Sequence, residues 1–589
     1  EKKEKLSKIE EEMQGVNRWW EGKDDKRKDP AQKWVDLSHN GVLFAPLYEP
    51  HGVKIKYDGV PVALLPEQEE YATYYSRYLE SDHCKKDIFR RNFWKCWKPM
   101  LKMNGLDKKI TDFSKIDFRP IWRHLQAEKE KNKSKTKEQK EVEKKEKEVI
   151  ADRYGFAMMD GVRERVGNYR VEPPGLFLGR GSHPKAGMFK HRVTPADITI
   201  NIGASHEAPK PSPPYEDSDW GEVVCNSTVT WLAYWKENVN GCYKYVMLHP
   251  SSRLKGEADM RKFDVARRLK DNVESIRADY TKKLRAKDVV VRQLATAMWV
   301  IDRLALRVGN EKGEDEADTV GCCSLRIEHV QCKPPSSIIF DFLGKDSMRY
   351  YNEVEVSEQV YKNFNRFMKG KKRGDDLFDK LSSGNLNAHL KTYMDGLSAK
   401  VFRTFNASYT LEQELSKLEF KKNATVEEKV LGFNRANRQV AILCNHQRSQ
   451  PKTHSAQMDK MKEKVADLKK EIAAIRKHKK SLMNSEEPPK KKAKVSEEGK
   501  KPKRLPQTVQ KCDDSIRRLK ERKQKWEIKM TEKDELKTIA LSTSKINYID
   551  PRLCVAWCNR EGVPIEKIFS KTLREKFAWA MEVDPHWKF

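Results

Sequence analysis

The apolar residues between positions 451 and 537 repeat with the spacing of a coiled coil. In a first run they follow one another in alternating steps of three and four residues, with a last step of seven. A second run begins after a stretch that four prolines interrupt, and Lys523 occupies one position of its seam. Heptads on both sides of a proline-rich turn predict two antiparallel helices that project as an arm. The runs are Met458, Met461, Val465, Leu468, Ile472, Ile475 and Leu482, then Val509, Cys512, Ile516, Leu519, Trp526 and Met530.

The pattern changes several times outside this arm. Clustered aromatic residues give way to short β-like runs punctuated by glycine and proline, and helical periodicity dominates after Pro250, with a strand interlude near 324–356. A Lys- and Glu-rich stretch at 128–148 predicts an exposed helix. We therefore expect a multidomain α+β protein. Its five parts would be a charged N-terminal segment (1–32), a mixed α/β part (33–252), a mainly helical part (253–450), the arm (451–537) and a small helical C-terminal domain (538–589).

The net charge of the chain indicates which kind of molecule it binds. The chain has 118 Lys and Arg against 88 Asp and Glu, a formal net charge of +30. Such an excess predicts nucleic acid as partner, ahead of an anionic membrane or an acidic protein. No apolar run has the length of a membrane span, and the most apolar stretch, 289–308, contains Arg292, Asp302 and Arg303. No signal-peptide pattern opens the sequence. We expect an intracellular protein that binds nucleic acid and does not enter a membrane.

The sequence predicts neither a metal site nor a nucleotide cofactor. The eleven cysteines are scattered, without two CxxC pairs at zinc-like spacing, which indicates buried thiols in a reducing compartment. No acidic cluster suggests a divalent metal. The nearest glycine cluster, Gly179-Arg180-Gly181, lacks the Gly-Lys-Ser/Thr ending of an ATP-binding P-loop.

Four cationic or ionisable residues stand in distinctive surroundings. Arg307 precedes Gly309, the expected C-cap of a helix, and Lys345 lies at the tip of a predicted hairpin. Arg403 lies within a predicted helix, and His446 follows the apolar stretch of another. Each has an ordinary alternative explanation. Arg307 would compensate a helix dipole, Lys345 would be a solvated turn residue, Arg403 a surface residue and His446 a boundary residue.

With Tyr548 these residues form a chemically complementary set. A tyrosine oxygen that attacks a DNA phosphodiester creates extra negative charge on the non-bridging oxygens, which two guanidinium groups and an imidazole can stabilise. The leaving 5′-oxygen needs a proton, which a lysine can supply. The phosphotyrosine conserves the bond energy, so the strand can be resealed without ATP.

Six stretches resemble the eukaryotic type IB DNA topoisomerase family, and the resemblance runs from about residue 33 to 589. They read DRLALRVGNEK (302–312), ADTVGCCSLRIEH (317–329), FDFLGKDSMRYYN (340–352), AKVFRTFNAS (399–408), NRANRQVAILCNHQR (434–448) and SKINYIDP (544–551). The resemblance implies a clamp around duplex DNA, made of a cap lobe, a catalytic lobe, a coiled-coil linker and a C-terminal domain that donates the nucleophile. It implies relaxation of supercoiled DNA, by a monomer, through a 3′-phosphotyrosine.

The resemblance also assigns roles to single residues. Tyr548 corresponds to the nucleophile, Lys345 to the general acid, and Arg307, Arg403 and His446 to the groups that stabilise the transition state. Among DNA-binding positions, Lys312 corresponds to a backbone contact. The positions that line the cleavage site, where camptothecin-type inhibitors bind in this family, are Arg180, Asp346 and Asn547.

The sequence departs from the family at a few positions. Leu178 stands where arginine is common, which bears on DNA contact and drug fit, and Ser542 stands where glycine is usual, which bears on the flexibility of the segment before Tyr548. A long basic N-terminal extension typical of the family is not among these 589 residues. Residues 489–495, Pro-Lys-Lys-Lys-Ala-Lys-Val, resemble a nuclear import signal. We expect a nuclear protein, with the mitochondrion as the alternative.

Two other functions remain as alternatives. A tyrosine recombinase would use a similar set of residues, but the predicted arm between His446 and Tyr548 argues against it. An architectural DNA-binding protein would explain the charge and the arm, but not five complementary residues in specific motifs.

Overall fold

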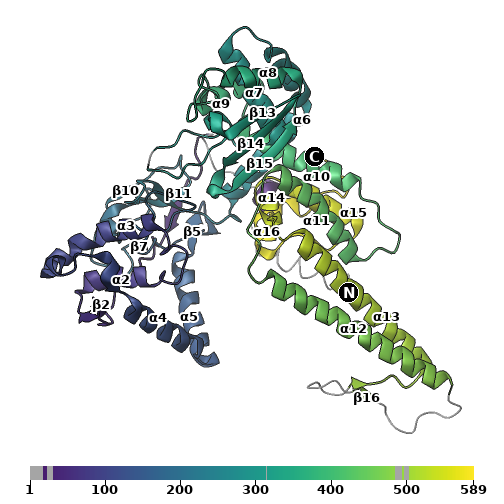
Figure 1. Ribbon diagram of the computed structural model, residues 1–589, viewed down its shortest axis with the longest axis horizontal. Coiled ribbons are helices and arrows are strands. Elements are labelled where there is room, and N and C mark those ends of the chain that lie inside the picture. Colours follow the sequence, from purple (N-terminus) through teal and green to yellow (C-terminus); the bar gives the residue numbers. More distant parts are fainter. Residues whose placement is uncertain (1–17, 23–28, 30, 314, 485–493, 496–502) are drawn as a thin grey trace.

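The computed structural model describes residues 18–22, 29, 31–313, 315–484, 494–495 and 503–589. Most of the predicted N-terminal segment, and residues 489–493 of the predicted import signal, lie outside this range. Figure 1 shows an N-terminal part in purple and blue, a helix-rich part in teal to yellow, and a pair of long helices that extends away from both. The chain is thus a multidomain protein of mixed α/β structure, as expected.

The N-terminal part has two hydrophobic cores. One contains Trp34, Ile200 and Trp235 and belongs to a four-stranded sheet of order β10-β9-β11-β12 and a three-stranded sheet β1-β5-β6. The other is rich in aromatic residues, including Phe89, Phe93 and Trp97. The bounds are β1 Leu37–His39, β2 Ile55–Tyr57, β3 Val60–Val62, α2 Pro66–Ser76, α3 Asp87–Trp97, β4 Ile116–Asp117, α4 Arg119–Lys133, α5 Lys137–Tyr154, β5 Phe156–Met159, β6 Val162–Arg165, β7 Gly175–Leu176, β8 Phe189–Lys190, β9 Ile198–Asn201, β10 Glu222–Val224, β11 Trp231–Lys236 and β12 Tyr243–Met247.

The single exposed helix predicted at 128–148 is instead divided between α4 and α5. Thr136 caps α5: its hydroxyl accepts a hydrogen bond from the Gln139 backbone N–H (3.2 Å), and the Gln139 side chain accepts one from the Thr136 N–H (3.0 Å). Such a capping box starts a new helix, and its short polar residues are hard to recognise within a run of Lys and Glu.

The middle of the chain is mainly helical around a three-stranded antiparallel sheet, β13-β14-β15. Its core contains Leu269, Val300, Phe340 and Phe402. The bounds are α6 Arg253–Lys283, α7 Val289–Leu304, β13 Val330–Lys333, β14 Ser337–Leu343, β15 Arg349–Glu355, α8 Glu358–Met368, α9 Ser383–Lys391, α10 Ala399–Ser416 and α11 Val426–Leu443.

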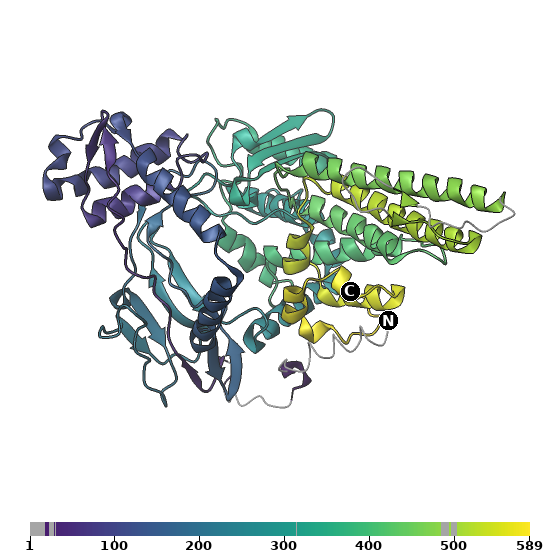
Figure 2. The ribbon, with the colours of Figure 1, turned by 90° about the horizontal axis from the view of Figure 1, so that it is seen from below.

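The arm consists of α12 (His454–Met483) and α13 (Val509–Glu535), which lie side by side in both views (Figures 1 and 2). Ile472 and Ile475 of α12 pack against Cys512 and Ile516 of α13, as the heptad seam predicts. The helices run antiparallel, because Lys479 pairs with Asp513 (2.6 Å) and His454 near the other end lies 3.7 Å from Asp534. Beyond them, β16 (Lys494–Val495) pairs with β17 (Lys503–Arg504).

The C-terminal segment shares a hydrophobic core with the middle of the chain. It comprises α14 (Leu541–Asn547), α15 (Pro551–Glu561) and α16 (Lys571–Lys576). Trp557 of α15 packs against Phe433 of α11, with ring centroids 5.0 Å apart and planes tilted by 48°, and Phe263 of α6 belongs to the same cluster. Six cysteines are buried as expected, whereas Cys225 and Cys242 are exposed; all eleven are free thiols.

Candidate active site

Arg307 lies on a segment without regular secondary structure, three residues after a helix has ended. Helix α7 ends at Leu304, and Ala305 adopts a left-handed conformation (φ 49°) that terminates it. The prediction that Gly309 is the C-cap is therefore wrong. Gly309 also has positive φ (+78°), and a side chain there would approach Gly321 to 2.6 Å, so it permits a close backbone crossing. The backbone carbonyl of Arg307 accepts a hydrogen bond from the Cys322 N–H (2.8 Å), which fixes the segment.

Arg403 is buried on α10 and connects the ends of two helices. Its guanidinium donates hydrogen bonds to the backbone carbonyls of Ala305, after α7 (2.5 Å), and of Cys444, after α11. Only 6% of the residue is exposed. The alternative of an ordinary surface arginine is wrong, because the polar end of α10 begins after this position.

His446 follows α11 and is held by backbone contacts on both sides. Its N–H donates to the carbonyl of Ala441 (2.8 Å), and its carbonyl accepts from the N–H of Ala540 (2.8 Å). The imidazole Nδ1 lies 2.9 Å from the hydroxyl of Ser544 on α14. The ring stacks on that of Tyr548, with centroids 5.5 Å apart and planes at 21°.

Tyr548 completes a compact cluster with these three residues. Its phenolic oxygen accepts a hydrogen bond from Arg307 Nη1 (2.8 Å), and the Arg403 guanidinium carbon lies 5.0 Å from the ring centre. The Tyr548 backbone carbonyl accepts a hydrogen bond from the Ser408 hydroxyl (3.1 Å). The tyrosine, only 6% exposed, is therefore held at both its backbone and its oxygen.

The two arginines set the ionisation of this cluster. Burial raises the pKa of the Tyr548 phenol, but the charges of Arg403 and Arg307 and the Arg307 hydrogen bond outweigh it, so the pKa lies below the ordinary value of 10. Burial, assisted by the same two charges, lowers the pKa of His446 to about 3. At neutral pH the imidazole is thus neutral, and the phenol is easier to ionise than in water.

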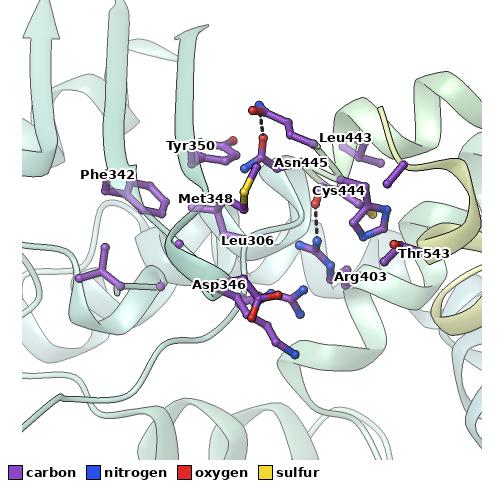
Figure 3. Close-up of a pocket in the computed structure, with 18 residues that line it drawn as sticks. Leu306, Phe342, Asp346, Met348, Tyr350, Arg403, Leu443, Cys444, Asn445 and Thr543 are labelled. Atoms are coloured by element: carbon purple, nitrogen blue, oxygen red, sulfur yellow. Dashed lines mark hydrogen bonds between the residues drawn. The ribbon is translucent and has the colours of Figure 1, made fainter. Parts of the chain in front are cut away.

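An open pocket of about 150 Å³ lies beside the cluster (Figure 3). Arg307, Arg403 and His446 line one side of it, and Lys345 and Asp346 line it from the tip of the β14–β15 hairpin. The hairpin agrees with the prediction from sequence. Lys345 is exposed, so the structure places it at the rim and not within the buried cluster.

The other predicted DNA-binding residues lie outside the cluster. Arg180, in the N-terminal part, pairs with Asp346, and a side chain at neighbouring Gly181 would collide with Ser347 (2.4 Å). Exposed Lys312 lies 3.7 Å from Glu316, and the exposed Asn547 side chain donates to the Thr543 carbonyl (3.2 Å).

The two departures from the family pattern are peripheral. Leu178 packs against the aromatic core of the N-terminal part, and Ser542 is exposed on α14.

Sequence reasoning missed the residues that hold the cluster. The backbone carbonyls of Ala305 and Cys444 cannot be predicted as hydrogen-bond acceptors, because every residue has such a carbonyl. Ser544 carries a weak signal, because it precedes Tyr548 by four residues, about one helical turn. Ser408 carries none, because its partner Tyr548 lies 140 positions further along the chain.

Two general properties concern the described part of the chain. No helix there combines the length and hydrophobicity needed to cross a membrane. No group of three or more His, Cys, Asp or Glu side chains among the described residues is arranged to hold a metal ion.

Comparisons with known proteins agree over nearly the whole chain. Residues 32–248 match the family model of the eukaryotic DNA topoisomerase I DNA-binding fragment, 251–479 that of the catalytic core, and 520–589 that of the C-terminal topoisomerase domain.

Individual relatives are close in sequence. The chain is 49% identical to DNA topoisomerase 1 beta of Arabidopsis thaliana (95% of this chain, 60% of the relative) and 48% identical to DNA topoisomerase 1 of Drosophila melanogaster (98% and 56%). It is 46% identical to DNA topoisomerase 1 of Homo sapiens (96% and 72%). The chain thus spans 56–60% of the length of the first two relatives. With these matches and its arginine-bound tyrosine, the chain belongs to the eukaryotic DNA topoisomerase I family.

Proposed function

We propose that this chain relaxes supercoiled duplex DNA by transient cleavage of one strand, rotation and religation, without ATP or a required metal. The observation that carries the proposal is the hydrogen bond from Arg307 to the Tyr548 oxygen, in a setting that lowers the pKa of the phenol. The family membership and the names of the relatives support the same activity.

In the proposed mechanism the Tyr548 phenol, whose pKa is lowered, first gives its proton to solvent. The phenolate oxygen then attacks the phosphorus and becomes linked to the 3′-phosphate. The bond to the 5′-oxygen breaks, and Lys345 gives that oxygen a proton. Arg307, Arg403 and neutral His446 donate hydrogen bonds to the non-bridging oxygens, where charge develops. Religation is the reverse: the 5′-hydroxyl returns its proton, attacks phosphorus and releases Tyr548.

The proposed architecture is a clamp on duplex DNA. Residues 33–252 would form the cap lobe, 253–450 the catalytic lobe, 451–537 a coiled-coil linker and 538–589 the C-terminal domain. The pair between Arg180 and Asp346 supports this arrangement, because it joins the N-terminal part to the hairpin that carries Lys345. Arg180, Lys312, Asp346 and Asn547 would contact DNA, and camptothecin-type inhibitors would bind at the cleaved site. The enzyme would act as a nuclear monomer.

Relaxation of supercoiled plasmid in the presence of EDTA and without ATP tests the activity. The wild-type chain should relax the plasmid, whereas Tyr548→Phe, which loses only the phenolic oxygen, should bind DNA without relaxing it or becoming covalently attached. Binding without relaxation by the wild type would favour an architectural role. Strand exchange between paired sites would favour a recombinase.

A further inference from the structure

The imidazole of His446 has two different environments at its two nitrogens. Nδ1 lies 2.9 Å from the Ser544 hydroxyl, whereas Nε2 is buried without a hydrogen-bond partner among the described residues. The ring lines the pocket with Arg307 and Arg403, and it is stacked on Tyr548. A buried nitrogen without a partner is costly, and a ligand that binds it is one explanation for its presence.

A neutral imidazole carries one N–H, so its tautomer decides what it offers to a phosphate. With the proton on Nε2, the ring donates to an anionic oxygen in the pocket. With the proton on Nδ1, Nε2 presents a lone pair that repels the same oxygen. Burial and the two guanidinium groups keep this imidazole neutral at physiological pH. The ring therefore carries a single proton, and the position of that proton decides which nitrogen donates.

The Ser544 hydroxyl determines which nitrogen of His446 carries the proton. Ser544 is 0% exposed, and His446 Nδ1 is the only hydrogen-bond partner of its hydroxyl within the described residues. A hydroxyl proton buried without an acceptor costs about 1–3 kcal/mol. The hydroxyl therefore has to donate to Nδ1, which must then be unprotonated, and the ring proton must be on Nε2.

The backbone keeps the two residues in register. His446 is fixed through the N–H of Ala540, one residue before α14, and Ser544 lies on α14 itself. The carbonyl of Ser544 also accepts the backbone N–H groups of Tyr548 and Ile549, both at 2.9 Å. One residue thus orients both the stacked imidazole and the turn that carries the tyrosine.

We propose that Ser544 is a positioning residue that holds His446 in its Nε2–H tautomer, so that the imidazole donates a hydrogen bond to a non-bridging oxygen of the scissile phosphate. This rests on the proposed function, since it assigns the phosphodiester as the ligand.

A double-mutant cycle on single-turnover cleavage separates this role from simple packing. Ser544→Ala should slow cleavage by about tenfold, the effect of losing one hydrogen bond. In a His446→Gln background, the side-chain amide donates whatever its neighbour is, so adding Ser544→Ala should cost less than about twofold. Equal losses in both backgrounds would show that Ser544 only packs the helix, and no loss with histidine present would also overturn the proposal. Ser542→Ala, at an exposed position of the same helix, is the matched control.

The tautomer can also be read without activity. In the full chain labelled with ¹⁵N-histidine, the signal that His446→Gln removes should show a protonated Nε2 and an unprotonated Nδ1, and Ser544→Ala should shift this population. A protonated Nδ1 in the wild type, or a population that does not respond to Ser544→Ala, would overturn the proposal. If the wild type fails to relax DNA, the proposed function fails while the tautomer is still tested. If the wild type relaxes DNA and Ser544→Ala matches it, only the role of Ser544 fails.

Discussion

Arg307 donates a hydrogen bond of 2.8 Å to the phenolic oxygen of Tyr548, a residue 241 positions further along the chain. The contact aims a permanent positive charge at the one oxygen that has to become negative in the proposed reaction. The same guanidinium can therefore favour the ionised nucleophile before attack and the phosphate oxygens during attack.

Replacing Arg307 should move the pH dependence of cleavage. Arg307 lowers the pKa of Tyr548 through its charge and its hydrogen bond, so Arg307→Gln raises that pKa. Cleavage needs the ionised phenol, and its rate should rise with pH and level off at a higher pH in the variant. We also expect a rate about 10²–10³-fold lower, the usual loss for one preorganised donor. Single-turnover cleavage of a nicked duplex across neutral and alkaline pH measures both effects. An unchanged profile would remove Arg307 from the ionisation of Tyr548.

Arg403 should matter for stability as well as for catalysis. Arg403→Ala leaves the carbonyls of Ala305 and Cys444 without their donors, at about 1–3 kcal/mol for each buried group. The variant should unfold at a lower temperature and cleave DNA slowly. Arg307→Ala is the matched control: its described side-chain hydrogen bond is to Tyr548, so it should lose activity and keep a melting temperature near that of the wild type. Equal melting temperatures for both variants would contradict the structural role of Arg403.

Lys345→Ala should be rescued by a substrate with sulfur in place of the 5′-oxygen. A thiolate leaves without a proton, so the variant should cleave this substrate at nearly the wild-type rate, while it cleaves the oxygen substrate slowly. Lys312→Ala, which changes an exposed lysine outside the pocket, should show no such difference. Rescue of a His446 variant in place of Lys345→Ala would transfer the general-acid role to His446.

Shortening the arm should preserve cleavage and reduce processivity. The pairs Lys479–Asp513 and His454–Asp534 give the register of the arm, so replacing residues 470–520 with a short loop removes its outer half. This truncation keeps the contact between Arg435 and Glu535 (2.7 Å), which joins α11 to α13. Because lysine contacts with phosphate weaken steeply with salt, relaxation by the truncated chain should become distributive at lower salt than in the wild type. Equal processivity across a salt titration would reduce the arm to a tether, and loss of cleavage would mean that it orders the site.

The parts of the molecule that repeat or alternate could be predicted from sequence. The heptad seam of α12 and α13 and the hairpin around Lys345 follow from local patterns, and both agree with the structure. The end of α7 could not be predicted, because left-handed Ala305 breaks the helix where Gly309 offered the stronger signal. The burial of Arg403 could not be predicted either, because its partners are backbone carbonyls from distant segments. Residue types thus suggested the chemistry that we propose, whereas long-range backbone contacts decide the geometry of the site.

The base of the arm is closed by backbone pairing. The Arg448 N–H donates to the carbonyl of Thr538 (2.9 Å), and Gln447 and Ile539 form an antiparallel bridge. The two chain segments that enter and leave the arm are therefore adjacent at its base. Both segments continue into the same hydrophobic core. Insertions, deletions or a proteolytic cut further along the arm would leave these backbone contacts in place. Changes in the length or sequence of the arm beyond this point therefore need not displace the tyrosine or the residues that face it.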